Sequence, residues 1–305
     1  MSDLEKENNL YLGIDGGGSK CRAIISDDQD RVLGTGVSGP ANPLHGFQKS
    51  LDSILAATHL ALNDANLGEK HIAQLIAGIG LAGVNLPALY QQVQSWQHPF
   101  KQMHLTTDLD IASLGAHGGD DGAVIIVGTG SCGFVSVGQQ KLTFGGHGFP
   151  IGDIASGAWM GLEAIRHTLQ VLDGFKDSSI LSDSVKSFYQ VDEALTLSEK
   201  VAGRSSRQYA KLAKVIFNAA DEGDLTANAI VNQGIDYISR MTRSILSKSP
   251  KRLSMIGGLA PLVLSRLPDY LSEQFVEPIA QPETGAVLFA RQQQAPISGT
   301  SKVAS

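Results

Sequence analysis

Two glycine-rich turns that carry hydroxyl side chains are the stretches of this 305-residue chain with the clearest capacity for chemistry. The first reads Asp15-Gly16-Gly17-Gly18-Ser19-Lys20 and the second reads Gly128-Thr129-Gly130-Ser131, and each follows an apolar run. Because glycine has no Cβ, backbone N–H groups in such turns can approach an anion closely enough to cradle phosphate oxygens. Two such turns, each opening one half of the chain, predict two similar domains that hold a polyphosphate between them.

Neither turn has the form of the commonest nucleotide-binding loops. Both lack the spacing Gly-x-x-x-x-Gly-Lys-Ser/Thr of a Walker A loop. A strand is expected after each turn, at residues 21–27 and 132–138, whereas a dinucleotide-binding turn leads into a helix. The two turns therefore indicate a phosphate site of a different class.

Two aspartates lie where they could act on a bound phosphate. Asp15 ends the first apolar run beside its glycine turn, and Asp108 ends the short run 103–108, where a helix is expected to begin. An aspartate at such a position can accept a proton as a general base, and it can equally cap the helix. From position alone, both roles remain open for Asp108, as do a turn-capping role and a ligand role for Asp15. Asp110 is interpreted as a first-turn helix charge.

The composition is that of an ordinary globular protein, with 42% hydrophobic and 18% charged residues. The net charge of −6 and the pI of about 5.7 argue against nucleic-acid binding, which leaves a basic footprint. The chain lacks an apolar run of about 18 residues, as a membrane span would need, and its polar start is unlike a signal peptide. The two cysteines, Cys21 and Cys132, are too few for a Cys-rich metal site and are expected to pack as small hydrophobes. These features predict a soluble, cytoplasmic α/β protein.

Hydrophobic period and turn residues predict the elements that must position these residues. Residues 118–122 form the best linker and predict a boundary between domains 1–117 and 118–305. The second domain is expected to contain a mostly helical insertion, 153–249, and a last helix at about 283–293 that could pack back towards the first domain. In each half, three successive strands predict the same opening pattern. The remaining predicted strands lie at 10–16, 32–39, 72–83, 123–130, 142–145 and 251–257, and the remaining helices at 46–66, 86–97, 108–117 and 262–275.

The order of these motifs resembles that of the actin, sugar-kinase and heat-shock ATPase superfamily. Within it, the chain is similar to the N-acetylglucosamine kinase family, which is related to the BadF/BadG/BcrA/BcrD-type ATPases and to activators of reductases and dehydratases. The resemblance covers roughly residues 10–292 and implies two ribonuclease H-like (actin-like ATPase) domains with a nucleotide and sugar cleft between them. It is carried by residues 14–18, 106–108, 127–131 and 145–153, by Gly257-Gly258 and by Gly285-Ala286.

The resemblance implies ATP and Mg²⁺ as cofactors and roles for individual residues. Asp108 is expected to be the catalytic base, and Asp15 is expected to support Mg²⁺ through water. Gly257 and Gly258 are expected to pack against the adenosine. The remaining phosphate-binding residues are expected to be Gly16, Gly17, Gly18, Ser19, Lys20, Gly128, Thr129, Gly130 and Ser131. The sugar-binding residues are expected to be Asn42, Asp108, Gly146, His147, Gly148 and Asp153.

Several of these residues also have a local alternative role. Lys20 could be a solvated surface lysine, Asn42 a turn residue before proline, and Asp153 the cap of the following helix. Two positions depart from the family pattern: His147 stands where Trp is common, and Ile154 stands where an acid is common. Both departures leave open which sugar is bound and in which orientation.

The leading functional hypothesis is an ATP-dependent kinase that converts N-acetyl-D-glucosamine to its 6-phosphate, in amino-sugar catabolism or cell-wall sugar salvage. Glucosamine kinase is the alternative within the class, because the sequence does not separate an acetamido pocket from an amino pocket. An ATPase activator of a dehydratase would need an iron–sulfur cluster held by thiolates, and both cysteines lie in or beside the glycine turns instead. A small-molecule amino sugar is the expected partner, and a homodimer is expected from family habit only.

Overall fold

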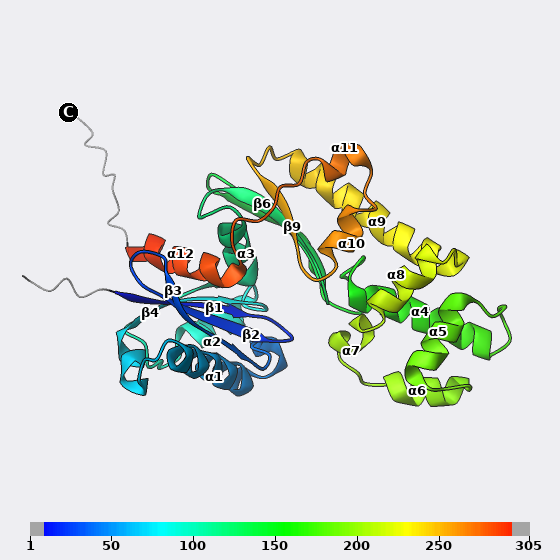
Figure 1. Cartoon of the computed structure of the whole chain (residues 1–305), viewed down its shortest axis with the longest axis horizontal. Coiled ribbons are helices and arrows are strands. Elements are labelled where there is room, and N and C mark those ends of the chain that lie inside the picture. Colours follow the sequence, from blue (N-terminus) through cyan, green and yellow to red (C-terminus); the bar gives the residue numbers. More distant parts are fainter. Residues whose placement is uncertain (1–8, 295–305) are drawn as a thin grey trace, which may run out of the picture. The chain divides into compact units, whose positions relative to one another are not determined.

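The computed structural model describes residues 9–294, which form two compact units (Figure 1). The first unit contains the described residues up to Asp120 and those from Pro278 onward, and the second unit is Asp121–Glu277. The sequence-based domains 1–117 and 118–305 put the last helix in the second domain, with the expectation that it could pack back towards the first. The structure groups this helix with the first unit. The reason is that the helix packs on the sheet of the first unit.

The first unit is built on a five-stranded sheet with the strand order β3-β2-β1-β4-β5. β1 (Leu10–Gly16), β2 (Cys21–Ser26) and β3 (Val32–Ser38) form an antiparallel meander, as the turn residues between them predict. β4 (Leu75–Leu81) is parallel to β1, and β5 (Gln102–Thr107) is parallel to β4. Because these three strands are parallel, their carboxyl ends meet at one edge of the sheet, where the first glycine turn follows β1.

Helices cover both faces of this sheet, which explains the continuous apolar runs of its central strands. α1 (Phe47–Asp64) and α2 (Pro87–Gln94) pack on the face that carries Ile14. α3 (Asp108–Ala116) and α12 (Pro282–Gln294) cover the other face. Figure 1 shows α1 and α12 on opposite sides of the strands.

α12 lies close to the sheet because two strand positions beneath it have no side chain. A Cβ on Gly13 would lie 2.0 Å from the carbonyl oxygen of Glu283, and a Cβ on Gly78 would lie 1.9 Å from that of Ala286. Any larger residue at either position would displace the helix. Glycine therefore fixes the first turns of α12 against β1 and β4.

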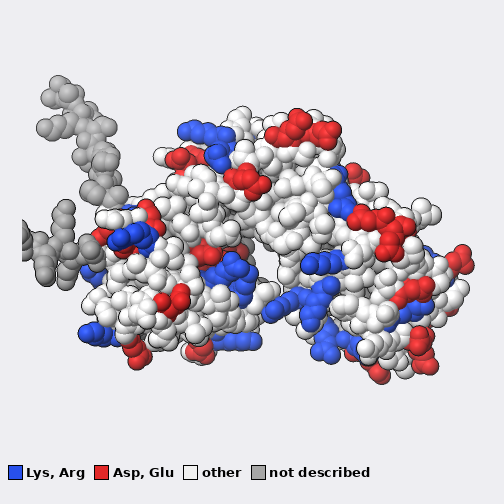
Figure 2. Space-filling model, viewed as in Figure 1, with Lys and Arg blue, Asp and Glu red and all other residues white. Residues whose placement is uncertain are grey.

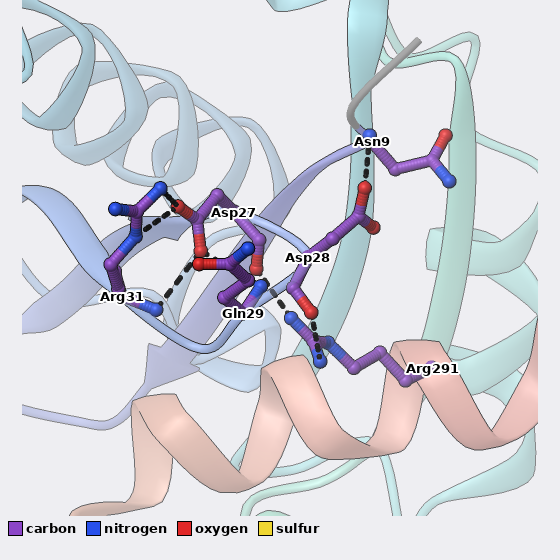
Figure 3. Close-up of polar contacts among 6 residues, drawn as sticks. All are labelled: Asn9, Asp27, Asp28, Gln29, Arg31 and Arg291. Atoms are coloured by element: carbon purple, nitrogen blue, oxygen red, sulfur yellow. Dashed lines mark hydrogen bonds and ion pairs between the residues drawn. The ribbon is translucent and has the colours of Figure 1, made fainter. Parts of the chain in front are cut away.

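The far end of α12 is tied to the turn between β2 and β3 by Arg291 (Figure 3). Its guanidinium donates hydrogen bonds to the backbone oxygens of Asp27 and Asp28. It also pairs with the Asp30 carboxylate at 3.1 Å and lies 4.5 Å from the centre of the Tyr11 ring. These contacts make α12 an integral part of the first unit.

Replacing Arg291 with Met is expected to lower the free energy of unfolding by about 2–3 kcal/mol, because charged hydrogen bonds and a cation–π contact are lost together. Urea unfolding of the purified protein measures this change. Arg31→Met is the matched control, because Arg31 binds the Asp27 carboxylate from the same turn but its side chain is 70% exposed. The expected loss for the control is less than about 1 kcal/mol. Equal losses for the two variants would contradict the anchoring role of Arg291.

The four strands of the second unit repeat the order of the first four strands of the first sheet. β6 (Gly122–Val127), β7 (Ser131–Val137) and β8 (Gln140–Gly145) are antiparallel neighbours, and β9 (Leu253–Ile256) is parallel to β6. The resulting order, β8-β7-β6-β9, confirms the repetition that the two glycine turns predict. The insertion between β8 and β9 consists of α4 (Gly157–Leu172), α5 (Ile180–Tyr189), α6 (Ala194–Val201), α7 (Ser206–Ala210), α8 (Ala213–Asp221) and α9 (Leu225–Leu246), and α10 (Ala260–Leu264) and α11 (Asp269–Ser272) follow β9.

Two predicted elements differ from the structure for local reasons. The predicted helix 262–275 is broken into α10 and α11 around Pro268, which has no N–H with which to continue a helix. The predicted strand 72–83 begins only at Leu75, because the residues before it form the 3₁₀ segment η2 (Glu69–Gln74). A second 3₁₀ segment, η1 (Pro43–His45), precedes α1.

The surface of both units carries charges of both signs. On the face drawn in Figure 2, acidic and basic side chains are interspersed with uncharged ones on each unit, in keeping with the net charge of −6. Of the helices within residues 9–294, none combines the length and the apolar character needed to cross a bilayer.

Candidate functional site

The first glycine turn connects β1 to β2, and a hydrogen bond of 2.9 Å from the Gly17 N–H to the Lys20 oxygen closes it. Gly16 is required by packing, since a Cβ there would lie 2.3 Å from a side-chain methyl group of β4. Gly18 is exposed, and a Cβ there would meet no atom within 4 Å. The turn therefore has a buried side that fixes it to the sheet and an open side that an anion could approach. The half-buried Ser19 and the exposed Lys20 lie next to that open side.

Asp15 and Asp108 lie at the carboxyl edge of the first sheet, at the end of β1 and directly after β5. Burial, with contributions from the carboxylates of Asp108 and Glu283, raises the pKa of Asp15 to about 7, while Arg22 acts in the opposite direction. Burial also raises the pKa of Asp108 to about 6, although the Leu109 N–H favours its charged form. The two acids form one electrostatic site, in which a bound cation would favour both charged forms.

The start of α3 shows which residue caps the helix. Thr107, not Asp108, caps the helix, because its hydroxyl accepts the Asp110 N–H at 3.1 Å. The buried Asp110 carboxylate accepts the hydroxyls of Thr106 and Thr107 at 2.7 and 2.8 Å, so this first-turn charge is also part of the cap. The Asp108 carboxylate accepts the Leu109 N–H at 3.0 Å. With the cap supplied by its neighbours, Asp108 is available for another role.

Asn42 serves a local turn through its side-chain oxygen. This oxygen accepts the Leu44 N–H at 2.9 Å and caps η1. Gly83 makes room for it, since a Cβ there would lie 2.5 Å from the same oxygen. The turn role that the sequence left open is therefore present, and the amide nitrogen is the donor that could meet a ligand hydroxyl.

The second glycine turn connects β6 to β7 and is held by the start of α4. The Gly157 N–H donates to the Gly128 oxygen at 2.8 Å. Ser131 has a structural role, because its buried hydroxyl donates to the Ile154 oxygen at 2.6 Å. The backbone of the turn and the half-buried Thr129 are the groups that could bind an anion.

The segment 145–153 reaches the second turn through Asp153. One carboxylate oxygen of Asp153 accepts the Gly148 N–H at 3.2 Å, and the other lies 2.8 Å from where a Cβ of Gly130 would be. Burial raises the pKa of Asp153, while the Gly148 N–H and His147 lower it. Asp153 has a φ of 57° and does not cap α4, because Ser156 holds that position. The expected sugar-binding residues Gly146, His147 and Gly148 are exposed in this segment.

The turn after β9 lies beside the second glycine turn. Gly257 has a φ of 109°, and a Cβ there would lie 2.3 Å from the Val127 oxygen, so packing alone requires glycine. At Gly258 a Cβ would meet no atom within 4 Å, and its N–H lies 3.9 Å from where a Cβ of Gly128 would be. Gly258 thus offers an open backbone surface on which a flat ligand group could lie.

A magnesium ion would meet carboxylates here without being enclosed by protein ligands. Within residues 9–294, no group of three or more His, Cys, Asp or Glu side chains could hold a metal ion by itself. Mg²⁺ usually keeps several waters and binds one or two carboxylates together with phosphate oxygens. Asp15 and Asp108 fit that pattern, because a cation would stabilise the charged forms that burial disfavours.

Three residues at these sites were not predicted from the sequence. Arg22 stands opposite Asp15 in the pairing of β1 and β2, and Glu283 is near enough to raise the pKa of Asp15. In the second unit, the Tyr237 hydroxyl lies 2.7 Å from where a Cβ of Gly145 would be. For Arg22, the strand register was a usable signal, because it places this arginine opposite Asp15. Glu283 and Tyr237 come from helices that are remote in the sequence.

Sequence comparisons find relatives along most of the chain. A family model described as the BadF/BadG/BcrA/BcrD ATPase family matches residues 12–290. The chain is 33% identical over 287 residues to the glucosamine kinase GspK of Vibrio cholerae, covering 92% of this chain and 96% of that protein. It is 27% identical over 279 residues to an N-acetylmuramic acid/N-acetylglucosamine kinase of Clostridium acetobutylicum, covering 87% and 88%.

A solved structure resembles the whole fold. It belongs to a candidate N-acetylglucosamine kinase of Chromobacterium violaceum, with a TM-score of 0.84 and 28% identity over 92% of this chain and 99% of that chain. Both units have three antiparallel strands followed by a parallel one. Together these findings confirm the expected α/β fold of two ribonuclease H-like domains of the actin-like ATPase type.

Proposed function

Because this chain belongs to the BadF/BadG/BcrA/BcrD ATPase family, whose model it matches over residues 12–290, we propose that it is an ATP-dependent kinase of an amino sugar. The products would be the sugar 6-phosphate and ADP. The observation that supports this most directly is the pair of Asp15 and Asp108 at the carboxyl edge of the first sheet, next to the first glycine turn. Transfer of a phosphoryl group to a hydroxyl requires a phosphate-binding turn and a carboxylate that can accept a proton.

D-Glucosamine is the first candidate for the sugar. The Vibrio cholerae glucosamine kinase is 33% identical to this chain, whereas the Clostridium acetobutylicum relative is 27% identical. N-Acetyl-D-glucosamine, the leading candidate from the sequence, becomes the second candidate. The Clostridium acetobutylicum relative and the Chromobacterium violaceum structure support it. The two sugars carry the same 6-hydroxyl and differ only at C2, so the catalytic argument applies to both.

Each unit, taken by itself, carries groups suited to sugar hydroxyls. In the first unit these are the Asn42 amide nitrogen and the Asp108 carboxylate. In the second unit they are the Asp153 carboxylate and the exposed backbone around His147. Carboxylates accept hydrogen bonds from hydroxyls, and N–H groups donate to them, so the groups of either unit are suited to contact a sugar.

Each glycine turn is suited to part of ATP and its metal ion. Residues 16–20 and 128–130 would donate backbone N–H groups to phosphate oxygens, and Gly258 would support the adenosine. Asp15 would hold Mg²⁺ through water. When bound, the ion would offset the negative charge of the phosphates.

In the proposed mechanism, Asp108 orients the sugar hydroxyl and takes its proton as the oxygen attacks the terminal phosphorus of ATP. The bond between that phosphorus and the bridging oxygen of ADP breaks in line with the attack. At pH 7 a carboxyl group with a pKa of about 6 is mostly ionised, yet it is basic enough to accept this proton. The hydrogen bond from the Leu109 N–H holds the carboxylate during the transfer.

A coupled assay of ADP release with Mg-ATP tests the proposed function. Glucosamine, N-acetylglucosamine, glucose and a sugar-free control are compared at equal concentration. Glucosamine is expected to stimulate ADP release at least about tenfold, and mass spectrometry is expected to find one added phosphoryl group on the sugar. Stimulation by N-acetylglucosamine alone would make the second candidate the substrate. ADP release that no sugar stimulates would contradict the kinase function.

An ATPase activator of a dehydratase is the alternative in a different class, and the cysteines argue against it. Such an activator needs thiolates that hold an iron–sulfur cluster. Cys21 is fully buried on β2, and burial raises the pKa of its thiol to about 12. Cys132 on β7 is half-buried. One inert thiol and one partly exposed thiol are a poor basis for a cluster.

A further inference from the structure

Arg22 and Glu283 form an ion pair beside Asp15. The Nη1 atom of Arg22 lies 3.6 Å from Oε1 of Glu283. Arg22 stands directly opposite Asp15 in the antiparallel pairing of β1 and β2, so the two side chains leave the sheet on the same face. The Arg22 side chain is 37% exposed. Its guanidinium is therefore accessible at the edge of the sheet where the first glycine turn begins.

The packing of α12, rather than the local sequence, places Glu283 at this edge. Gly13 lets the backbone of Glu283 contact β1 on the same face as Asp15, two residues further along the strand. Glu283 is buried, with 9% of its surface exposed. Its Oε2 atom has no hydrogen-bond partner among the residues that the structure describes. The buried carboxylate thus lies with Oε1 near the guanidinium.

Stability alone does not explain this arrangement. A buried carboxylate with an unsatisfied oxygen costs free energy. Glu283 also lies near a second acid, Asp15, whose pKa it helps to raise. An ion pair with a partly exposed arginine contributes little in return. We therefore look for the role of Glu283 in its effect on Arg22, the side chain that it contacts.

We propose that Arg22 binds the phosphoryl group at the first glycine turn and that Glu283 is the positioning residue that fixes the Arg22 guanidinium. This inference rests on the kinase function proposed above. A guanidinium presents N–H groups on more than one edge, so Glu283 can hold one edge while another meets two phosphate oxygens. During transfer, negative charge spreads over the oxygens of the phosphoryl group. A cation that is already fixed in place stabilises that charge without reorganisation.

A double-mutant cycle with Arg22→Met, Glu283→Gln and the double variant tests this inference. Calorimetry without sugar gives the affinity for Mg-ATP, and steady-state kinetics with the preferred sugar gives kcat. Arg22→Met is expected to weaken ATP binding about tenfold and to lower kcat about 100-fold, and Glu283→Gln is expected to lower each about fivefold. In the Arg22→Met background, Glu283→Gln is expected to change neither quantity by more than about twofold.

Two further variants keep the test decisive. Arg31→Met, at an exposed arginine on the β2–β3 turn, is the matched control and is expected to leave ATP affinity and kcat unchanged. Arg22→Met leaves the buried Glu283 carboxylate without a cation, which could prevent the variant from folding. Arg22→Lys keeps the positive charge and avoids this problem. It is expected to lower kcat about tenfold, because lysine lacks the planar guanidinium.

Three outcomes would count against the proposals. Equal effects of Glu283→Gln in both backgrounds would overturn the positioning role. Wild-type ATP affinity and kcat in the folded Arg22 variants would overturn the role of Arg22. A wild-type protein that binds Mg-ATP but phosphorylates no sugar would refute the kinase function, and the affinity measurements would still decide whether Arg22 binds phosphate.

Discussion

Asp108→Asn is expected to lower kcat about 10³-fold while changing the KM for the sugar by less than about threefold. Asn has nearly the same shape as Asp, and its side-chain oxygen can still accept the Leu109 N–H, so the start of α3 is preserved. The variant loses the capacity to take a proton from the attacking hydroxyl. Steady-state kinetics with the preferred amino sugar measures the loss, and thermal unfolding verifies that the variant is folded.

Asp108 also sets the expected pH dependence. Burial raises its pKa to about 6, and the ionised form is the one that accepts a proton. In the wild type, kcat/KM for the sugar is therefore expected to fall about tenfold for each pH unit below about 6 and to level off above about 7. The residual activity of Asp108→Asn should lack this inflection. If the inflection persists in the variant, it arises from a titratable group other than Asp108.

Asp110→Asn is the matched control for the base assignment. Asp110 lies two residues away, and its carboxylate accepts the hydroxyls of Thr106 and Thr107. An amide can replace a carboxylate only in part as an acceptor, so we expect a loss of stability of about 1–2 kcal/mol with kcat within about fivefold of the wild type. A loss of kcat as large as that of Asp108→Asn would contradict the assignment of the base to Asp108.

Asp15→Asn is expected to have opposite effects on activity and on stability. Without the carboxylate that would support Mg²⁺, kcat is expected to fall about 10²-fold. In the metal-free protein at about pH 8, the same change is expected to raise the free energy of unfolding by about 2 kcal/mol. The reason is that burial raises the pKa of Asp15 from 3.8 to about 7, which makes its charged form costly in the folded state.

The sign of this pH dependence follows from proton binding. Between about pH 4 and about pH 7, the folded protein binds more protons at Asp15 than the unfolded chain does, so stability falls as the pH rises through this window. Below about pH 4 the destabilisation is absent, and above about pH 7 it is complete. The difference between 3.8 and about 7 corresponds to about 4 kcal/mol, and solvent at the half-buried carboxyl reduces it to about half.

Urea unfolding in the presence of EDTA, at about pH 4 and about pH 8, tests this prediction. The stability gain of Asp15→Asn is expected to be small at the lower pH and large at the higher one. Asp27→Asn is a control for which the expected change in stability has the opposite sign. Although burial raises the pKa of Asp27, hydrogen bonds from Arg31 and Gln29 outweigh it and lower the pKa overall, so this variant should lose stability at about pH 8. An Asp15→Asn protein that is less stable than the wild type at about pH 8 would contradict the account.

Features that depend on neighbouring residues could be predicted from the sequence. The antiparallel strands on either side of each glycine turn follow from short apolar runs separated by turn residues. The same local logic located Asp15 at the end of a strand and Asp108 at the start of a helix. It could not decide whether Asp108 caps α3 or has another role, and it did not identify Thr107 as the cap.

The packing of the last helix towards the first domain was expected, but the individual contacts between residues remote in the sequence could not be predicted. The packing of α12 on the sheet requires Gly13 and Gly78 to contact the backbone of this helix, which lies about 200 residues or more further along the chain. The ion pair of Arg22 and Glu283 depends on that packing. The role of the Ser131 hydroxyl depends on the path of the chain at Ile154, and no local pattern encodes it.

Since the first unit contains residues from both ends of the described chain, its folding cannot be completed until α12 has been synthesised. The five strands of its sheet leave the ribosome long before α12 does. Until then Tyr11, Ile24 and Ile76 lack the cover that Val287 and Ala290 provide. A nascent chain or proteolytic fragment that stops before α12 therefore presents an apolar face to chaperones and proteases, which recognise such surfaces. A single helix thus distinguishes chains that can complete the first unit from chains that stop before it.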